Sequence, residues 1–146
     1  MNLRNITEKD NSRIRELIYI CKPLGLHTSF TYWVLTKYFP NLCFLMESDK
    51  KLIGFISALR STIDDKVLFI WQIAVSPEYR GKRYASILIK TVVDSGTNIG
   101  CNRFQLSISP KNIQSYKAFL HFSEQYNISF YRIDKLEISD NFTNQV

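Results

Sequence analysis

Four consecutive residues, Arg80, Gly81, Lys82 and Arg83, form the densest cluster of positive charge in the sequence. They follow an apolar run that ends at Val75, and a helical pattern of apolar residues comes next. The first N–H groups of a helix have no intrahelical acceptor and lie at the positive end of the helix dipole. With the basic side chains, they can bind an anion such as a phosphate. The sequence therefore predicts an anion site here, and an ordinary solvated basic turn is the alternative.

The elements on either side of this turn position it. Residues 68–75, LFIWQIAV, are almost wholly apolar and rich in β-branched and aromatic types, which predicts a strand buried on both faces. Pro77 cannot continue a central strand because it lacks a backbone donor. Five residues then recur at helical spacing, which predicts a helix with one face packed on the sheet; they are Tyr84, Ile87, Leu88, Thr91 and Val92.

Length and composition limit the class of protein. With 146 residues, 45% hydrophobic and 22% charged, the chain is predicted to be one domain, 1–146, of a soluble globular protein. It has no apolar run of membrane-spanning length and no apolar core of a signal peptide, so we expect no membrane association and a cytoplasmic location. Its cysteines, Cys21, Cys43 and Cys101, are widely spaced, so we expect reduced core thiols and no metal site.

The net charge of +6 suits a small anionic ligand, and equally RNA, DNA or an acidic protein. A protein that binds nucleic acid usually shows a stripe of basic residues interleaved with exposed aromatic side chains. Here the basic residues are dispersed, apart from positions 80–83. We therefore expect no nucleic-acid partner.

The remaining periodicities predict a mixed α/β fold. Strands are expected at 2–6, 42–47, 52–58 and 103–108, and helices after Thr7, from about Thr28 and from Asn112. The polar turn at 48–50 predicts an antiparallel hairpin. Strands 68–75 and 103–108, with a helix between them, predict a parallel pair joined by a right-handed crossover. The order as a whole indicates a mixed sheet with helices on both faces.

The pattern Val75-x-Pro77-x-x-Arg80-Gly81-x-x-x-Ala85 resembles the acetyl-CoA pyrophosphate motif of the GNAT N-acetyltransferases, Arg/Gln-x-x-Gly-x-Gly/Ala. This resemblance implies the GNAT fold, a mainly antiparallel mixed sheet with a splayed central strand pair, and acetyl-CoA as the cofactor. The departure is Arg83, where the family motif has Gly. Its backbone therefore has either a negative φ or some strain.

Within the family, residues 20–120 look most like the diaminobutyrate acetyltransferases of ectoine biosynthesis. The most specific match is Leu68-Phe69-x-Trp71-Gln72-x-Ala74-Val75; other matches include Cys21-x-Pro23, Gly54-Phe55-x-Ser57 and Ile108-x-Pro110-x-Asn112. Gly25 stands where that subfamily has an acidic residue, His27 stands where Asn is usual, and the chain stops before its longer C-terminal strand region. We therefore expect acetyl-CoA use more firmly than diaminobutyrate specificity.

The resemblance also implies a set of cofactor residues. A free N–H group at the splayed strand would polarise the thioester carbonyl, and Asn112 would bind the cofactor arm, although a helix cap explains Asn112 equally well. The implied cofactor-binding residues are Ile73, Ala74, Val75, Arg80, Gly81, Lys82, Arg83, Tyr84, Ala85, Ser86, Asn112, Ser115 and Phe119.

Acetyl transfer needs a neutral amine and a proton for the departing thiolate. Trp71 would supply a desolvating wall, or is simply core. Many family members have Tyr at the position of Phe119, which cannot donate a proton, so Tyr116 and Tyr32 are the candidate acids. The predicted catalytic residues are thus Trp71, Tyr116 and Tyr32, and the predicted substrate-binding residues are His27, Tyr32, Trp71 and Gln72.

Two further sets of residues complete the site predictions. His27 is also a candidate base, whereas His121, among aromatic residues of the last helix, is expected to be structural. Local carboxylates could attract a cationic substrate into the pocket, but the sequence does not place them; the candidates are Glu47, Asp64, Glu124 and Asp134.

The leading hypothesis is an acetyl-CoA-dependent transferase that acetylates a primary amine of a small molecule, such as the diamino acid diaminobutyrate, by direct attack in a ternary complex. Two alternatives stay open: a CoA-binding module with little catalysis, and an acetyltransferase for protein Lys side chains or N-termini. An open groove beside Trp71 would favour a protein substrate, and a closed pocket lined by Glu or Asp a small amine. A homodimer is expected, because an incomplete sheet leaves a hydrogen-bonding edge.

Overall fold

The computed structural model describes residues 1–133, and Asp134 lies outside this range. It contains a five-stranded sheet in the order β1-β2-β3-β4-β5. The first four strands pair antiparallel and β5 pairs parallel with β4, which confirms the predicted mixed, mainly antiparallel sheet. The strands are β1 (Asn2–Asn5), β2 (Phe44–Ser48), β3 (Lys51–Arg60), β4 (Val67–Val75) and β5 (Arg103–Leu106).

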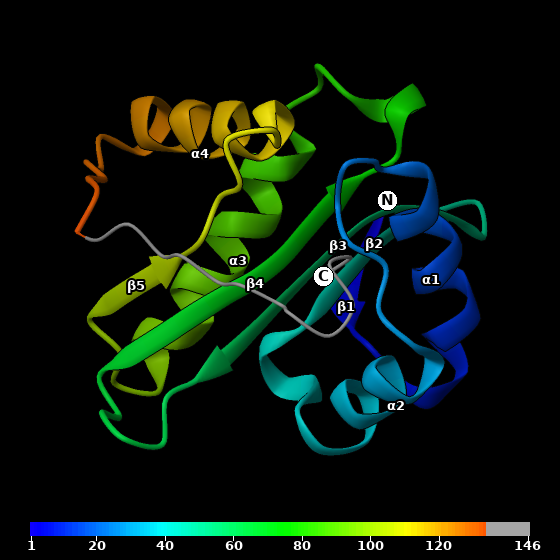
Figure 1. The fold of residues 1–146 in the computed structure, drawn as a ribbon, viewed down its shortest axis with the longest axis horizontal. Coiled ribbons are helices and arrows are strands. Elements are labelled where there is room, and N and C mark those ends of the chain that lie inside the picture. Colours follow the sequence, from blue (N-terminus) through cyan, green and yellow to red (C-terminus); the bar gives the residue numbers. More distant parts are fainter. Residues whose placement is uncertain (134–146) are drawn as a thin grey trace, which may run out of the picture.

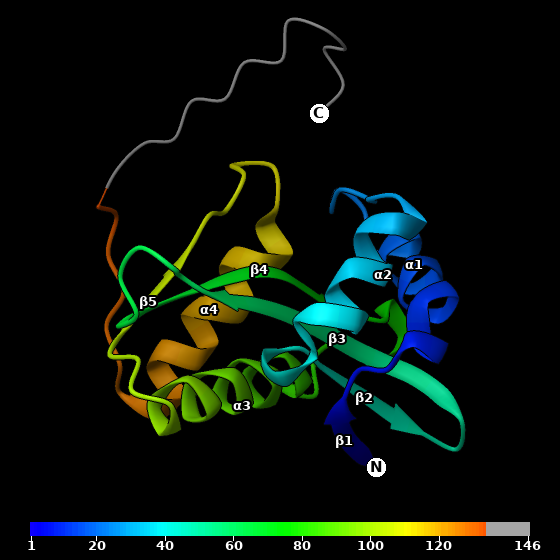
Figure 2. The same cartoon turned by 90° about the horizontal axis from the view of Figure 1, so that it is seen from below.

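Helices cover both faces of the sheet, as predicted. Helices α1 (Asn11–Ile20) and α2 (Ser29–Tyr38) lie on one face, and α3 (Tyr84–Asn98) and α4 (Ile113–Tyr126) lie on the other (Figures 1 and 2). Each pair encloses its own apolar core. Strand β4 contributes to both cores, because its side chains alternate between the two faces.

Local sequence signals explain where several elements begin. The side-chain oxygen of Thr28 accepts a hydrogen bond of 3.2 Å from the Thr31 N–H and so caps α2 at the predicted position. The hairpin between β2 and β3 turns on two residues rather than the predicted three, because Asp49 and Lys50 both adopt positive φ, as a tight hairpin turn requires.

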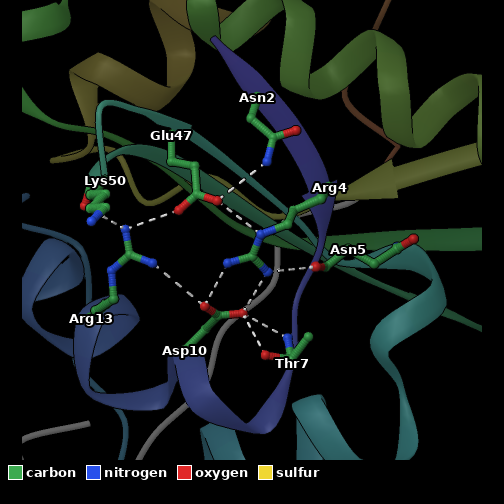
Figure 3. A network of polar contacts seen from close by, with 8 residues as sticks. All are labelled: Asn2, Arg4, Asn5, Thr7, Asp10, Arg13, Glu47 and Lys50. Carbon is green, nitrogen blue, oxygen red and sulfur yellow. Dashed lines mark hydrogen bonds and ion pairs between the residues drawn. The ribbon is translucent and has the colours of Figure 1, made fainter.

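A network of charged side chains fastens β1 and β2 to the start of α1 (Figure 3). Arg4 donates to both oxygens of Asp10 over 2.9 Å and to Glu47 over 2.9 Å. Asp10 also accepts from the Thr7 N–H over 2.7 Å, and Arg13 lies 3.1 Å from Glu47. Because the Arg4 guanidinium pairs with both carboxyls, it holds the pKa of Asp10 and of Glu47 below their usual range.

The close approach of α3 to the sheet depends on Gly54 in β3. A Cβ atom at this position would lie 2.9 Å from Cδ1 of Leu88 and 3.2 Å from the carbonyl oxygen of Ala74. The missing side chain therefore lets α3 pack directly over β3 and β4. This contact sets the N-terminus of α3 beside the end of β4.

Two sequence predictions concern the chain as a whole. Cys21, Cys43 and Cys101 are free and buried, as predicted. Within residues 1–133, the helices are too short or too polar to cross a membrane.

Candidate functional site

The centre of the site is the point where β4 and β5 separate. Their parallel pairing runs from Val67 opposite Arg103 to Ile70 opposite Leu106, where β5 ends. The predicted strand 103–108 is thus two residues too long. Among residues 1–133, no strand pairs with the rest of β4, up to Val75, on that side. The splayed strand pair implied by the family resemblance is therefore present.

The backbone of β4 presents N–H groups to this gap. On the opposite edge, the Gln72 N–H donates to Oγ of Ser57 over 3.1 Å and the Ser76 N–H donates to the Ile53 carbonyl over 2.8 Å, both on β3. Because successive N–H groups of a strand point to opposite edges, those of Ile73 and Val75 point into the gap. They are suited to pair with an extended amide chain or to polarise a carbonyl.

A β-bulge lies at the start of the unpaired stretch. Ser57 pairs with Gln72 whereas Ala58 pairs with Ile70, so Trp71 is the extra residue of β4. A bulge increases local twist and bends the strand. This bend accounts for the divergence of β4 from β5 immediately after Ile70.

The turn after β4 keeps the backbone path that glycines usually supply. A short 3₁₀ helix at Pro77–Tyr79 follows the strand, and Nε of Arg80 donates back to the Val75 carbonyl over 3.2 Å. Gly81 has φ of 81° and Arg83 has φ of 63°. Arg83 therefore occupies the left-handed region. The sequence left open a negative φ or some strain at this residue, and the positive φ means that the backbone is strained.

A cavity of about 370 Å³ joins the gap to this turn and to the N-terminus of α3. All the predicted cofactor residues line it except Lys82 and Phe119. The ammonium of Lys82 lies 5.6 Å from the ring centre of Tyr79, and Phe119 is buried in the core beneath α4. The lining residues predicted from the sequence are Ile73, Ala74, Val75, Arg80, Gly81, Arg83, Tyr84, Ala85, Ser86, Asn112 and Ser115.

Sequence reasoning missed several lining residues. They come from the segment after α1, from the 3₁₀ turn and from one face of α4: Cys21, Lys22, Leu24, Tyr79, Gln114, Lys117, Ala118 and His121. His121, which the sequence analysis expects to be structural, is exposed and lines the cavity. The missed α4 residues share one helical face among themselves, at positions 114, 117, 118 and 121, but spacing counted from Asn112 leads to positions 115, 116 and 119 instead.

The charge of the cavity favours an anionic ligand. The basic side chains in its lining include Lys22, Arg80, Arg83 and Lys117, and no Asp or Glu lines it among residues 1–133. The predicted carboxylates lie elsewhere: Glu47 is paired with Arg4 and Arg13, Asp64 is paired with Arg103, and Glu124 is exposed on α4 outside the lining.

Asn112 caps α4 and also lines the cavity. Its side-chain oxygen accepts a hydrogen bond of 3.1 Å from the Ser115 N–H. Its amide nitrogen has no hydrogen-bond partner within residues 1–133. The helix-cap interpretation thus holds, and the amide nitrogen is left for a ligand.

The predicted substrate-binding residues meet on the α2 side of the sheet. The fully buried Tyr32 donates from its hydroxyl to Oε1 of Gln72 over 2.9 Å, and Nε2 of Gln72 donates to the Gly25 carbonyl over 2.6 Å. The rings of His27 and Trp71 lie 5.0 Å apart. Burial lowers the pKa of His27 and raises the pKa of Tyr32.

The three residues predicted to be catalytic are not brought together. Trp71 and Tyr32 belong to the cluster on the α2 side, whereas Tyr116 packs against Phe130 with ring centres 6.2 Å apart. None of them lines the cavity. The roles of Tyr32 and Tyr116 as proton donors stay predictions.

Comparisons with known proteins agree with this geometry. Residues 11–122 match the model of the acetyltransferase (GNAT) family. The chain is 31% identical to the L-2,4-diaminobutyric acid acetyltransferase of Vibrio cholerae over 80% of the chain and 67% of that protein. It is 26% identical to the enzyme of the same name from Halalkalibacterium halodurans over 83% of the chain and 64% of that protein. The chain thus spans about two thirds of the length of these curated relatives.

Solved structures of acetyltransferases are also similar to this chain. The diaminobutyrate acetyltransferase of Paenibacillus lautus, solved in complex with L-2,4-diaminobutyric acid and coenzyme A, has a TM-score of 0.80 and 29% identity, over 86% of this chain and 76% of that one. An acetyltransferase from Salmonella typhimurium, solved with acetyl-CoA, shares the fold at 14% identity, with a TM-score of 0.68 over 82% of this chain and 76% of that one. The chain therefore belongs to the acetyltransferase (GNAT) family of acyltransferase enzymes, whose cofactor is acetyl-CoA, as the sequence resemblance predicted.

Proposed function

We propose that the protein transfers the acetyl group of acetyl-CoA to a primary amine of a small molecule within a ternary complex. The observation that carries the proposal is the unpaired stretch of β4 after Ile70, which opens into a basic cavity beside the N-terminus of α3. One end of this cavity suits phosphates, and the other offers backbone N–H groups to an extended amide chain.

In this proposal the pyrophosphate of CoA lies against the turn at 80–83 and the first N–H groups of α3. Gly81 and Arg83 have the positive φ values that turn successive N–H groups toward one anion. Arg80 supplies charge at the end of β4. The pantetheine arm then extends along β4 and pairs with Ile73 and Val75.

The reaction is a direct displacement. The amine nitrogen attacks the thioester carbonyl carbon, the C–N bond forms, the C–S bond breaks, and CoA leaves as the thiolate. An N–H group of β4 stabilises the charge that develops on the carbonyl oxygen. A thiol with pKa near 8.5 needs little help to leave as the anion, so the reaction does not depend on Tyr32 or Tyr116.

The amine is assigned to the side of β4 that carries His27 and Trp71. Burial beside the Trp71 ring lowers the pKa of an alkylammonium ion and so raises the share of reactive neutral amine. Burial also lowers the pKa of His27, which keeps its imidazole neutral and able to accept the proton that the attacking amine releases.

L-2,4-Diaminobutyric acid is the first substrate to test, because the relatives at 31% and 26% identity are named for it and a similar solved structure contains it. One feature weighs against a dicationic substrate: the described lining of the cavity contains no carboxylate. Other primary amines therefore belong in the same experiment.

The test is a calorimetric titration of acetyl-CoA into the protein, followed by a thiol-release assay with diaminobutyrate, ornithine, lysine, putrescine and a peptide N-terminus. Saturable binding with thiol release for a small amine would support the proposal. Binding without release would instead favour the CoA-binding module, and release only with the peptide would favour a protein acetyltransferase. No binding would overturn the proposal.

A homodimer is proposed as well. Strand β5 is the last strand of the sheet within residues 1–133, so its outer edge has no strand partner there. Exposed apolar side chains follow α4; they are Ile128, Phe130, Tyr131 and Ile133. Pairing with a second copy would cover both features. Sedimentation of only monomer at micromolar concentration would contradict the homodimer.

The cytoplasmic location stays a prediction.

A further inference from the structure

The cavity has more positive charge than one pyrophosphate needs. Arg80 and Arg83 come from the turn after β4, whereas Lys117 and His121 come from α4. The two α4 residues are four apart, so they lie one above the other on the same face of the helix. The turn can hold the pyrophosphate alone, which leaves this second basic pair without an assigned ligand.

Lys117 differs from other lysines near the site, because it has no protein partner among the residues that the structure describes. Lys82 and Lys22 lie over the rings of Tyr79 and Tyr19, and Lys90 pairs with Asp94. Within residues 1–133, no ion pair or aromatic ring engages Lys117, and no carboxylate lines the cavity beside it. An exposed ammonium at the rim of a cavity without carboxylates favours an anionic group of a bound ligand.

We propose that Lys117 and His121 bind the 3′-phosphate of CoA, so that this chain discriminates against 3′-dephospho-CoA. The inference rests on the proposed function, because it assumes that CoA occupies the cavity. The Lys117 ammonium pairs with the dianionic phosphate, and the His121 imidazole donates an N–H to it. Gln114, one turn earlier on the same face, lines the cavity next to this pair and can donate a further hydrogen bond.

The test compares CoA with 3′-dephospho-CoA by calorimetric titration into the wild type, Lys117→Gln and His121→Ala. We expect the wild type to bind CoA at least about tenfold more tightly than 3′-dephospho-CoA. Lys117→Gln should weaken CoA binding by about the same factor and change 3′-dephospho-CoA binding by less than about twofold. His121→Ala should act in the same direction with a smaller effect. Lys111→Gln is the matched control, because Lys111 is exposed just before α4 and does not line the cavity.

Two results would overturn the assignment. The first is equal affinity of the wild type for the two ligands. The second is an equal loss of affinity for both ligands in Lys117→Gln, which would mean that Lys117 acts on the pyrophosphate or on the fold. The proposed function fails separately. A protein that binds CoA with the expected preference, but releases no thiol from acetyl-CoA with any amine, would contradict catalysis and leave the phosphate assignment standing.

Discussion

The Tyr32 hydroxyl donates a hydrogen bond of 2.9 Å to the side-chain oxygen of Gln72, linking α2 to β4 inside the core. The same hydroxyl accepts from the His27 N–H over 3.5 Å, and Gln72 donates onward to Gly25. The segment that carries His27 is thereby tied to the strand that carries the gap. This link connects the two sides of the proposed site, because Gln72 and Ile73 are neighbours on β4.

Tyr32→Phe separates a structural role of this hydroxyl from a catalytic one. The substitution removes one buried hydrogen bond and leaves the Gln72 oxygen unpaired. The free energy of unfolding, measured in urea, should therefore fall by about 1–2 kcal/mol. Acetyl-CoA affinity should change by less than about twofold, since Tyr32 does not line the cavity. Tyr19→Phe, at an exposed position, is the control. Unchanged stability with a loss of kcat greater than about 100-fold would instead make Tyr32 the proton donor.

His27→Gln tests whether His27 is the general base that accepts the proton of the attacking amine. It should lower kcat by about 100-fold and leave acetyl-CoA affinity unchanged. Because burial lowers the pKa of His27, its neutral form persists to lower pH than that of a free imidazole. The acid limb of the wild-type pH–rate profile should therefore lie below the range of free imidazole, and it should disappear in the variant. An identical acid limb in both proteins would exclude His27 as the base.

Arg83→Gly and Arg83→Ala distinguish strain from charge. Both variants remove the guanidinium from the cavity, so both should bind acetyl-CoA more weakly, and to the same extent. Only Gly relieves the positive φ of 63°, so Arg83→Gly should be more stable than Arg83→Ala by about 1 kcal/mol. Thermal and urea unfolding measure the difference. Equal stability would mean that the turn relaxes out of the left-handed conformation.

Ser57→Ala tests the bulge. The Ser57 hydroxyl accepts from the Gln72 N–H at the point where β4 has its extra residue, and Ser57 is fully buried. Without the Ser57 hydroxyl, the Gln72 N–H is buried and unpaired, so the free energy of unfolding should fall by about 1–3 kcal/mol. Because the bulge directs Ile73 into the gap, kcat should fall as well. Wild-type kcat despite the lower stability would uncouple the bulge from catalysis.

The network around Asp10 predicts acid sensitivity. The pKa values of Asp10 and Glu47 are lowered in the folded protein, so their contribution to stability is present above the pKa of the unfolded chain. It is lost as pH falls through the lowered pKa. The difference between the urea midpoints at about pH 7 and about pH 3 measures this loss of stability. The difference should be smaller in Asp10→Asn than in the wild type. Glu16→Gln, which alters an exposed carboxylate outside the network, should leave the loss intact.

The sequence alone indicated the family, through its resemblance to the GNAT motif, and the order of the elements, and it predicted an anion-binding turn at 80–83. These depend on local signals: a buried apolar strand, Pro77 after it, and basic residues at a helix N-terminus within a short stretch of chain. Such signals are readable because the interacting groups are close in sequence. The family resemblance implied Asn112 and Ser115 as cofactor residues, and both line the cavity, where Asn112 also caps α4.

Only the tertiary structure decided which side chains share a cavity. His121 and Lys117 line it because α4 packs beside α3, and Cys21 lines it because the segment after α1 crosses the end of β4, where its thiol donates to the Val75 carbonyl over 3.4 Å. Phe119 turns instead into the core, and Tyr116 packs on Phe130. Helical spacing shows which residues share a face, but the partner of that face depends on packing between elements far apart in the sequence.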